Sequence, residues 1–300
     1  MSRFMTIVEK LDTLDKRWVF LVVGLAVVVS TIFRLTFPER PTPMVCAIYE
    51  KIESLPEGSR VLLPFDYDPG SEPELQPMAD AFVRHCCEKG LVMYFIALWP
   101  LGQNMVDGVI RRVLTVEYPD LEYGVDYVDM GYKAGNEGVI AVILTDLKKL
   151  YTTDAHGSSI QRIPMMEGIS NIRSFDLILN ISAGYPGLKE WIQYAGTPGN
   201  IPVAGGCTAV QAPLLYPYHP EQLLGLMGGI KAAAEYEALL LQGYPKFRND
   251  KNRFQTALTR MGPQTIAHLS IVFFIILGNI TFQILRRRRA QERQSQQRQE

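Results

Sequence analysis

The chain has 300 residues with 30 basic and 31 acidic side chains, a length that suits one or two soluble domains. The charges are unevenly spread, since residues 41–263 contain 18 basic and 25 acidic side chains. Nucleic-acid binding, which depends on Lys and Arg at phosphates, is therefore not expected. The four cysteines include no pair with CxxC spacing, which argues against a zinc site, and a domain of this size needs no disulfide framework.

The N-terminal segment is expected to meet a membrane and then to cross it. Residues 1–17 place apolar side chains at helical spacing, which predicts an amphipathic interfacial helix, with a frayed tail as the alternative. Residues 18–37 are almost wholly apolar, with Arg34 as the only charged residue, and about 20 such residues span the hydrocarbon core as a helix. The alternative is a cleaved signal peptide. The run is too long for one and no A-x-A site follows it, so we interpret it as an uncleaved anchor.

The segment 45–245 alternates between patterns typical of strands and of helices. Short apolar runs, typical of strands buried on both faces, occur at residues 60–66, 91–98, 127–130, 176–182 and 201–206. Helical spacing occurs at residues 45–55, 73–89, 102–117, 135–150, 187–195 and 219–242, with a strand as the alternative for 139–144. This alternation predicts one α/β domain with a mostly parallel sheet and helices on both faces, a Rossmann-like architecture. Residues 151–174 are polar and expected to be irregular.

The C-terminal part repeats the membrane pattern. A basic connector, residues 246–263, precedes an apolar run at 265–285, which predicts a second transmembrane helix. Residues 286–300 form an Arg-rich tail. Asn279 and Gln283 within the apolar run are expected to face another helix, which is the first span, a second copy or a different subunit.

Two spans would make an integral membrane protein with both termini on one side and the α/β domain on the other. The flanks that belong to the termini contain ten Lys and Arg residues, against seven on the domain side. Loops with excess positive charge normally stay in the cytoplasm. The sequence therefore favours cytoplasmic termini and an extracytoplasmic α/β domain.

Ligands of an open parallel sheet bind beyond the carboxyl ends of its strands. The loops expected there contain glycines, which let backbone N–H groups approach a ligand, although glycines also serve plain tight turns. The loop GYKAGNEG matches neither a P-loop nor a dinucleotide fingerprint, so no cofactor is indicated. The candidate ligand-binding residues are Asp66, Asp68, Lys133, Ser182, Gly184, Gly205, Gly206, Cys207 and Thr208.

Four acidic residues follow the first predicted strand. Asp66 and Asp68 flank one tyrosine, so on an extended chain their carboxylates face one way. They could contribute to a Mg²⁺ or Ca²⁺ site, but two ligands are far short of a full set. Glu72 and Glu74 fall at the first turn of the next helix, where the helix dipole stabilises negative charge. Only the two aspartates therefore remain as site candidates.

Cys207 lies in the sequence GGCTA after the fifth predicted strand. A thiol at such a turn can act as a nucleophile when a histidine and a helix terminus activate it, and His156 or His219 would be the partner. Pro213 and Pro217 follow Cys207 without a helical pattern, so a structural cysteine is the favoured interpretation. Ser182 lacks the G-x-S-x-G context of a nucleophilic serine.

Three stretches and the two flanking apolar runs carry a resemblance to a known family. The stretches are PEGSRVLLPFDYDPGSEPELQP, SAGYPGLKEWIQYAG and VAGGCTAVQAP. Together they resemble uncharacterised two-span membrane proteins of bacteria and archaea over most of the chain. The resemblance implies the two-span architecture and transfers no catalytic residue, because no reaction is assigned to that family.

The function expected from these features is that of a non-catalytic binding or assembly component of a membrane protein complex. Its expected partners are the lipid bilayer and either other membrane subunits or further copies of the same chain. The alternative is a membrane-surface hydrolase or transferase that uses Asp66, Asp68 or Cys207 at the carboxyl edge of the sheet. A transporter is disfavoured, because two spans enclose no pathway.

Overall fold

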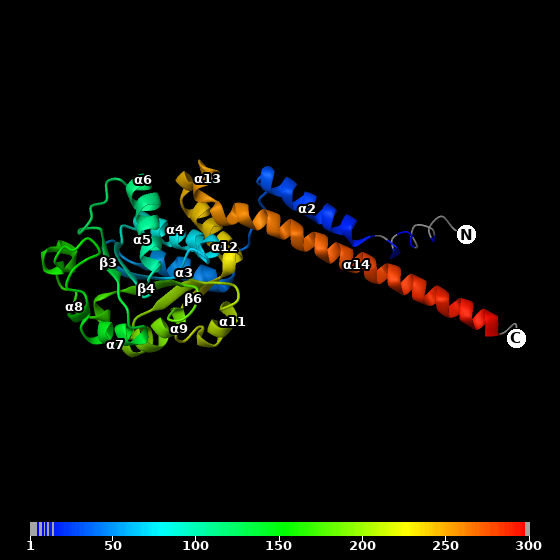
Figure 1. The fold of residues 1–300 in the computed structure, drawn as a ribbon. Coiled ribbons are helices and arrows are strands. Elements are labelled where there is room, and N and C mark those ends of the chain that lie inside the picture. Colours follow the sequence, from blue (N-terminus) through cyan, green and yellow to red (C-terminus); the bar gives the residue numbers. More distant parts are fainter. Residues whose placement is uncertain (1–4, 6–7, 9, 11, 14, 298–300) are drawn as a thin grey trace. The chain divides into compact units, whose positions relative to one another are not determined.

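The computed structural model describes residues 5, 8, 10, 12–13 and 15–297 (Figure 1). The chain divides into two compact units, one formed by Met1–Phe37 with Thr259–Glu300 and the other by Pro38–Leu258. The amphipathic helix predicted over residues 1–17 lies mostly outside the described residues.

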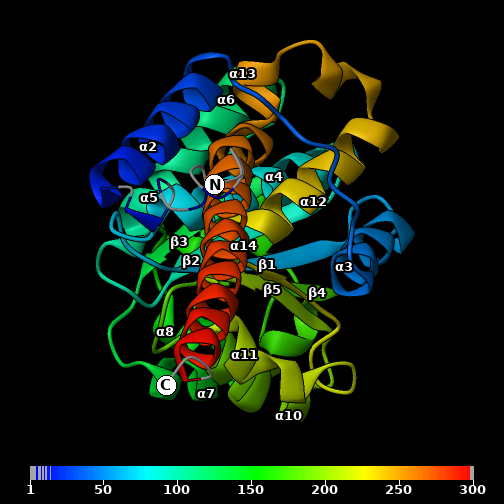
Figure 2. The ribbon, with the colours of Figure 1, turned by 90° about the vertical axis from the view of Figure 1, so that its right-hand side faces the viewer.

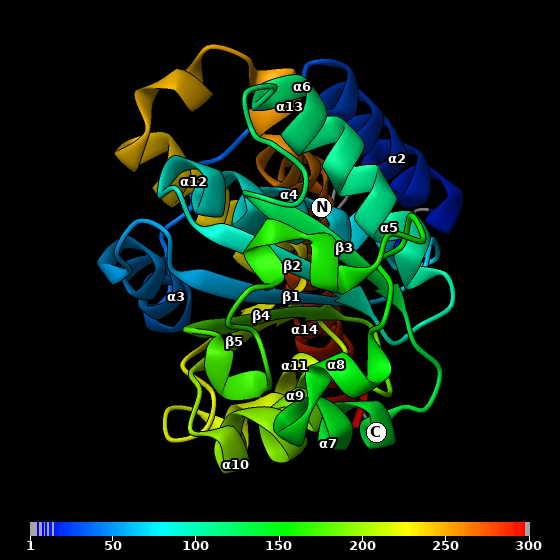
Figure 3. The ribbon, with the colours of Figure 1, turned by 90° about the vertical axis from the view of Figure 1, so that its left-hand side faces the viewer.

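The unit Pro38–Leu258 is built on a six-stranded, all-parallel sheet with the order β3-β2-β1-β4-β5-β6 (Figure 3). The strands are β1 (Arg60–Asp66), β2 (Val92–Ala97), β3 (Tyr127–Tyr132), β4 (Leu177–Ser182), β5 (Val203–Cys207) and β6 (Gly225–Gly228). The direction of winding reverses between β1 and β4, as in doubly wound Rossmann-like sheets. The strands are almost wholly buried, which explains why their sequences are continuous apolar runs and do not alternate. The predicted parallel sheet is confirmed.

Helices cover both faces of this sheet (Figures 2 and 3). One face carries α4 (Glu72–Glu88), α5 (Gly102–Val109) and α12 (Gly229–Gly243). The other carries α7 (Glu137–Thr145), α9 (Leu188–Trp191) and α11 (Ala212–Leu215). Helix α3 (Pro43–Ser54) packs beside β6 and α12.

Several predicted helices are interrupted. Helix α5 continues through a π-helical segment, Ile110–Leu114, into α6 (Thr115–Glu117), and α9 continues through Ile192–Gly196 into α10 (Thr197–Gly199). The predicted helix 135–150 is split into α7 and α8 (Leu147–Leu150), because Asp146 caps α8 by accepting a hydrogen bond from the Lys149 N–H at 3.2 Å. Between residues 151 and 174 the structure has short 3₁₀ turns, at Ile160–Arg162, Pro164–Met166 and Ile172–Ser174.

The helix predicted over residues 219–242 is wrong in its first half. Residues Gly225–Gly228 form the edge strand β6, and α12 begins only at Gly229, where φ is +76° and a side chain would be strained. A Cβ atom at Gly225 would collide with the carbonyl oxygen of Met44, so this strand needs a glycine to lie against α3. A four-residue apolar strand has no periodicity that separates it from a buried helix.

The other unit contains α2 (Lys16–Ile32) and α14 (Thr256–Gln297), whose first residues belong to the α/β unit. One helix in the described part of the chain, Thr256–Gln291, is long and apolar enough to cross a membrane, and an 18-residue stretch of it has a mean hydropathy of 2.0. Helix α2 has 17 residues and is shorter than the predicted span 18–37, because it ends before Arg34, where φ is +47°. At 1.5 Å per residue it measures about 25 Å, short of the ~30 Å hydrocarbon core. The N-terminal span is therefore not shown by the structure.

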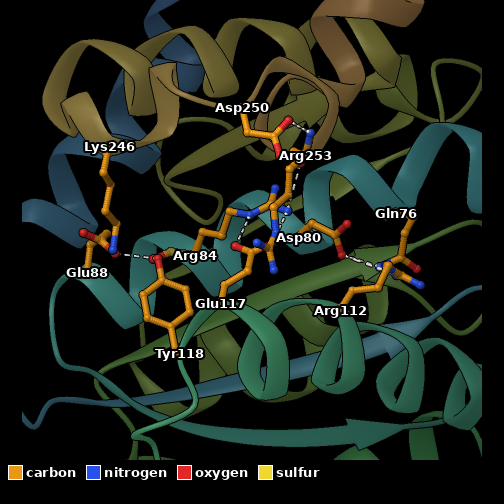
Figure 4. A network of polar contacts seen from close by, with 10 residues as sticks. All are labelled: Gln76, Asp80, Arg84, Glu88, Arg112, Glu117, Tyr118, Lys246, Asp250 and Arg253. Carbon is orange, nitrogen blue, oxygen red and sulfur yellow. Dashed lines mark hydrogen bonds and ion pairs between the residues drawn. The ribbon is translucent and has the colours of Figure 1, made fainter.

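A network of charged side chains fixes α13 (Lys251–Phe254) to α4 and α6 (Figure 4). Arg84 donates hydrogen bonds to both carboxylate oxygens of Glu117, each at 2.9 Å, and to the carbonyl oxygen of Arg253 at 3.1 Å. The Arg253 side chain also contacts Glu117, at 3.1 Å. The side chains of Arg84 and Glu117 are each 5% exposed, so the chain that leads into α14 is held by a buried ion pair.

Candidate functional site

The carboxyl edge of the sheet brings several of the predicted site residues together. Asp66 at the end of β1 pairs in register with Ser182 at the end of β4, and Ser182 pairs with Cys207 at the end of β5. Lys133 follows β3, where its N–H donates to the carbonyl oxygen of Ala97 at 3.0 Å. The common edge expected from the strand pattern is thus present, although sharing an edge does not by itself make a binding site.

Asp66 is a buried structural hub. Its carboxylate accepts hydrogen bonds from the Leu98 N–H, the Asn180 Nδ2 and the Trp191 Nε1, each at 2.8 Å. Burial raises the pKa of Asp66 to about 7, against the opposing effect of these three donors. The carboxylate has no exposed surface, so it ties β1 to β2, β4 and α9 at the point where the sheet reverses its winding.

Asp68 has a different environment from Asp66. It is half-buried in the turn before α4, and its Oδ1 accepts a hydrogen bond from the Ser71 N–H at 3.2 Å. Among the residues that the structure describes, no group of three or more His, Cys, Asp or Glu side chains is placed to hold a metal ion. The two aspartates therefore serve the fold in separate ways.

Cys207 belongs to the apolar core, with no exposed surface. Burial, with a smaller effect of Glu74, raises the pKa of its thiol to about 12, so the thiol is protonated near neutral pH. His219 uses its Nδ1 with the carbonyl oxygen of Leu223 at 3.0 Å. His156 lies in the segment after α8 and packs against the Tyr123 ring. This geometry agrees with the structural cysteine favoured by the sequence.

The glycines predicted to bind a ligand are packed against side chains. A Cβ atom at Gly184 would lie 3.1 Å from the ring of Trp99, and one at Gly206 would lie 2.5 Å from the Sδ of Met78. A Cβ at Gly205 would collide with the carbonyl oxygen of Asn180. Gly205 therefore requires glycine, because the atom that a Cβ would meet is backbone, while at Gly184 and Gly206 the neighbouring side chains would have to shift. Thr208 follows β5, where its carbonyl oxygen accepts the Gln211 N–H at 3.0 Å in a turn.

The Ser182 side chain also has a structural partner. Its Oγ accepts a hydrogen bond from the Leu188 N–H at 2.9 Å, which fixes the first turn of α9. Trp99 closes over the same loop by donating from Nε1 to the carbonyl oxygen of Pro186 at 2.8 Å. The loop after β4 is therefore filled by protein groups at the place where the strand order predicts a ligand crevice.

A polar cavity of about 360 Å³ lies instead beside the carboxyl end of β3. Lys133 is the predicted site residue that lines it. The remaining lining comes from the start of α5, the end of β3 and the loop before residue 157. The lining residues are Gln103, Asp107, Met130, Gly131, Tyr132, Lys133, Thr153, Asp154, Ala155 and His156.

Gln103 is held in one orientation by two carboxylates. Its Nε2 donates to Asp107 Oδ1 at 3.1 Å and to Asp129 Oδ2 at 2.5 Å, so its Oε1 must point away from both acids. That Oε1 is buried and has no hydrogen-bond partner. Asp129 also accepts the Gly131 N–H at 2.9 Å, and burial raises the pKa of Asp129 to about 6. Gln103 therefore lines the cavity with a carboxamide whose nitrogen is held by two acids and whose buried oxygen makes no hydrogen bond.

Asp154 shapes the other wall of the cavity. Its Oδ2 accepts a hydrogen bond from the Tyr123 hydroxyl at 2.8 Å, and its Oδ1 accepts the N–H groups of His156 and Ser158 at 3.0 and 2.7 Å. These bonds fold the loop so that the exposed His156 stands at the rim. Lys133 Nζ lies 5.3 Å from the ring centre of Tyr151, whose buried hydroxyl also has no partner.

Sequence reasoning missed Gln103, Asp107, Asp129 and Asp154. Asp129 carried a usable signal, because a carboxylate inside a strand predicted to be buried must be paired. Gln103 and Asp107 carried no such signal, because polar residues at their positions are ordinary on the exposed side of a helix.

Comparisons with known proteins add little. A scan against models of known protein families found no match, and a search of curated proteins found no significant similarity. Among solved structures, the trehalose-6-phosphate synthase OtsA matches 82% of this chain with 11% identity and a TM-score of 0.27. The match covers 48% of that protein, so this chain spans about half its length. A TM-score this low carries no argument about function.

Proposed function

We propose that the chain is a membrane-anchored binding component of a membrane protein assembly, which holds a small polar ligand in the cavity beside β3. The binding role rests on one observation: Gln103 lines a cavity of about 360 Å³, and its buried Oε1 makes no hydrogen bond. An unsatisfied buried acceptor destabilises a protein by about 1–3 kcal/mol. A ligand that donates an N–H or O–H group to this oxygen would remove that penalty on binding.

The charges of the lining favour a donor-rich ligand over an anion. Asp107 and Asp154 line the cavity and Asp129 lies behind Gln103, whereas Lys133 is the one Lys or Arg among the lining residues. An anionic ligand would meet like charge, while hydroxyl or amino groups would find acceptors. The ligand class proposed is therefore a small polyol or amine.

The anchoring role rests on two segments, helix α14 and the N-terminal apolar run 18–37. The proposed arrangement has two spans, residues 18–37 and 265–285, with cytoplasmic termini and an extracytoplasmic α/β domain. It is supported by the four arginines at 286–289, which directly follow the second apolar run, and by the ten-to-seven excess of basic residues on the terminal side. The resemblance to two-span membrane proteins is in line with the two spans and carries nothing about their orientation.

Ligand-induced thermal stabilisation of the full chain in lipid nanodiscs tests the binding role. Polyols, amines and organic anions are compared on the wild type, on Gln103→Leu and on the control Gln222→Leu, which changes a glutamine in a different cavity. A polyol or amine should raise the Tm of the wild type and the control but not of Gln103→Leu. Equal shifts in all three proteins, or shifts caused by anions alone, would contradict the proposal.

Purification from native membranes in mild detergent tests the assembly role. The proposal expects the chain to migrate as a complex, with a mass above that of one chain in its detergent micelle. A chain that is recovered quantitatively as a monomer, without other proteins, would contradict it.

A second candidate, a membrane-surface hydrolase or transferase, is favoured by Asp129. Its pKa of about 6 is close to the value that suits a general base near neutral pH, and His156 is close enough to lower that pKa. This candidate requires turnover that rises through about pH 6 and disappears in Asp129→Asn. Unchanged turnover in that variant would exclude Asp129 as the base.

A further inference from the structure

Two amide side chains interrupt the apolar part of α14. Asn279 and Gln283 lie four residues apart and therefore on the same face of the helix, and both are exposed. The Asn279 Nδ2 donates to the carbonyl oxygen of Ile275 in its own helix at 2.8 Å. This bond leaves the Oδ1 acceptor and the second amide hydrogen of Asn279 available to another molecule.

Helix α2 packs on a different face of α14. The groove between these two helices, about 570 Å³, is lined on the α14 side by Phe274, Ile275 and Thr281, among others, whereas Asn279 and Gln283 do not line it. Thr281 is only 5% exposed. Thr281 follows Asn279 by two residues, which places it about 160° around the helix at ~100° per residue. The first apolar segment, one of the three partners that the sequence allowed, therefore does not cover Asn279.

An uncovered carboxamide is costly at this position. The run 265–285 contains no formal charge when His268 is neutral, and hydrocarbon offers neither donors nor acceptors to an amide. Polar residues in such a run are expected to face another helix and to hydrogen-bond across the contact. The partner must then present a polar group at the same depth in the bilayer.

We infer that the partner is a second copy of this chain, bound in parallel through the α14 face that carries Asn279 and Gln283. All copies of one chain share one membrane topology, so Asn279 of one copy lies at the same depth as Asn279 of the other. A carboxamide carries both donors and acceptors, so two identical amides can satisfy each other. Gln283 repeats the pairing one turn later. The inference rests on the proposed function only in requiring that α14 crosses the membrane.

The arginines at 286–289 oppose this contact, because two copies bring eight positive charges to one membrane edge. Anionic headgroups at that edge attract juxtamembrane basic residues, by about 1 kcal/mol for each Lys or Arg. The repulsion between copies is therefore largely neutralised by lipid in an anionic bilayer, and the test must be made in such a bilayer.

Disulfide cross-linking of the full chain in vesicles that contain anionic lipid tests the contact. Asn279→Cys is compared with Leu277→Cys, which lies about 3 Å away in depth but about 160° around the helix, on the side that lines the groove with α2, and with the unmodified chain. Asn279→Cys should form a disulfide-linked dimer at least about ten times faster than Leu277→Cys. Equal rates, or a link to a different protein, would overturn the inference.

Energy transfer between donor- and acceptor-labelled copies gives a second measurement. Asn279→Leu should lower the association constant about tenfold, whereas Asn279→Gln and the control Leu277→Ile should leave it within about twofold of the wild type. Unchanged association in Asn279→Leu would overturn the inference.

An alkaline carbonate wash separates the two proposals. Loss of the chain from the vesicles contradicts the membrane anchor, whereas a chain that stays in the vesicles as a monomer contradicts the contact between copies and leaves the anchor in place.

Discussion

The Glu237 carboxylate accepts a hydrogen bond from the Leu258 backbone N–H at 2.9 Å, and it accepts the adjacent Ala257 N–H at the same distance. These N–H groups belong to the first turn of α14, whose free donors need partners. A buried acid on α12 therefore caps the helix proposed to enter the membrane. Burial raises the pKa of Glu237 to about 7, although both hydrogen bonds and Arg84 act in the opposite direction.

Glu237 should make the stability of the α/β domain fall as the pH rises. The pKa is raised from 4.5 to about 7, so between these values the folded protein holds a proton that the unfolded chain has lost. Stability from this group is fully present below pH 4.5 and is lost as the pH rises through about 7. The change amounts to roughly 3 kcal/mol in the free energy of unfolding.

Glu237→Gln isolates this effect, because Asp66 has a raised pKa in the same range and contributes to the total. The amide resembles the protonated acid, so the free energy of unfolding of the variant should be closest to that of the wild type near pH 4.5. At pH 8 the variant should gain stability relative to the wild type, because the wild type loses its proton there and the amide does not change. Denaturation in urea at both pH values provides the comparison. A difference between the two proteins that does not vary with pH would contradict a titrating Glu237.

Arg84 should be far more important for stability than Arg112. Replacing Arg84 with Met leaves Glu117 buried without its bidentate partner, which should lower the free energy of unfolding by about 3 kcal/mol or more. Arg112 is 44% exposed and lies 3.4 Å from Asp80, so Arg112→Met should cost less than about 1 kcal/mol. Urea denaturation of both variants measures the loss in the free energy of unfolding. Similar losses in the two variants would show that the burial of an ion pair does not decide its contribution to stability.

The strands that the sequence predicts well are those with long apolar runs. Strands β1 and β4 are seven and six residues long and almost wholly buried, so composition alone marks them. Strand β6 has four residues and two glycines, and its place depends on α3, which lies more than 170 residues earlier in the chain. The break at Asp146 depends on a local cap that an apolar periodicity does not reveal. Short elements set by tertiary packing were therefore missed.

The site was predicted less well than the fold for a related reason. Strand order correctly places Asp66 and Ser182 at one edge, but it cannot tell that Trp191, 125 positions from Asp66, fills the space there. The glycine-rich loops looked accessible, because a sequence does not show that Trp99 packs over Gly184. The cavity beside β3 forms from loops that only the folded chain brings together.

Asp66→Asn should destabilise the domain although it is nearly isosteric. Three donors converge on the Asp66 carboxylate, and the amide group of Asn would turn an N–H donor toward one of them. The expected loss in the free energy of unfolding is roughly 2–4 kcal/mol. Asp68→Asn is the matched control, because its Oδ1 can still accept the Ser71 N–H, and its loss should stay below about 1 kcal/mol. Equal losses in urea denaturation would contradict the role of Asp66 as a hub.

Thiol labelling at pH 7.5 should rank the cysteines by exposure. Cys207 has no exposed surface and a pKa raised to about 12, so both access and the thiolate fraction are low. Cys46 is half-buried, and its labelling should exceed that of Cys207 by ~100-fold in the folded protein. Mass spectrometry of the labelled peptides, with Cys207→Ser to confirm the assignment, gives the rates, and the difference should vanish in denaturant. Rapid labelling of folded Cys207 that slows in His219→Gln would instead mean that the thiol is activated, and it would favour the enzyme over the binding component.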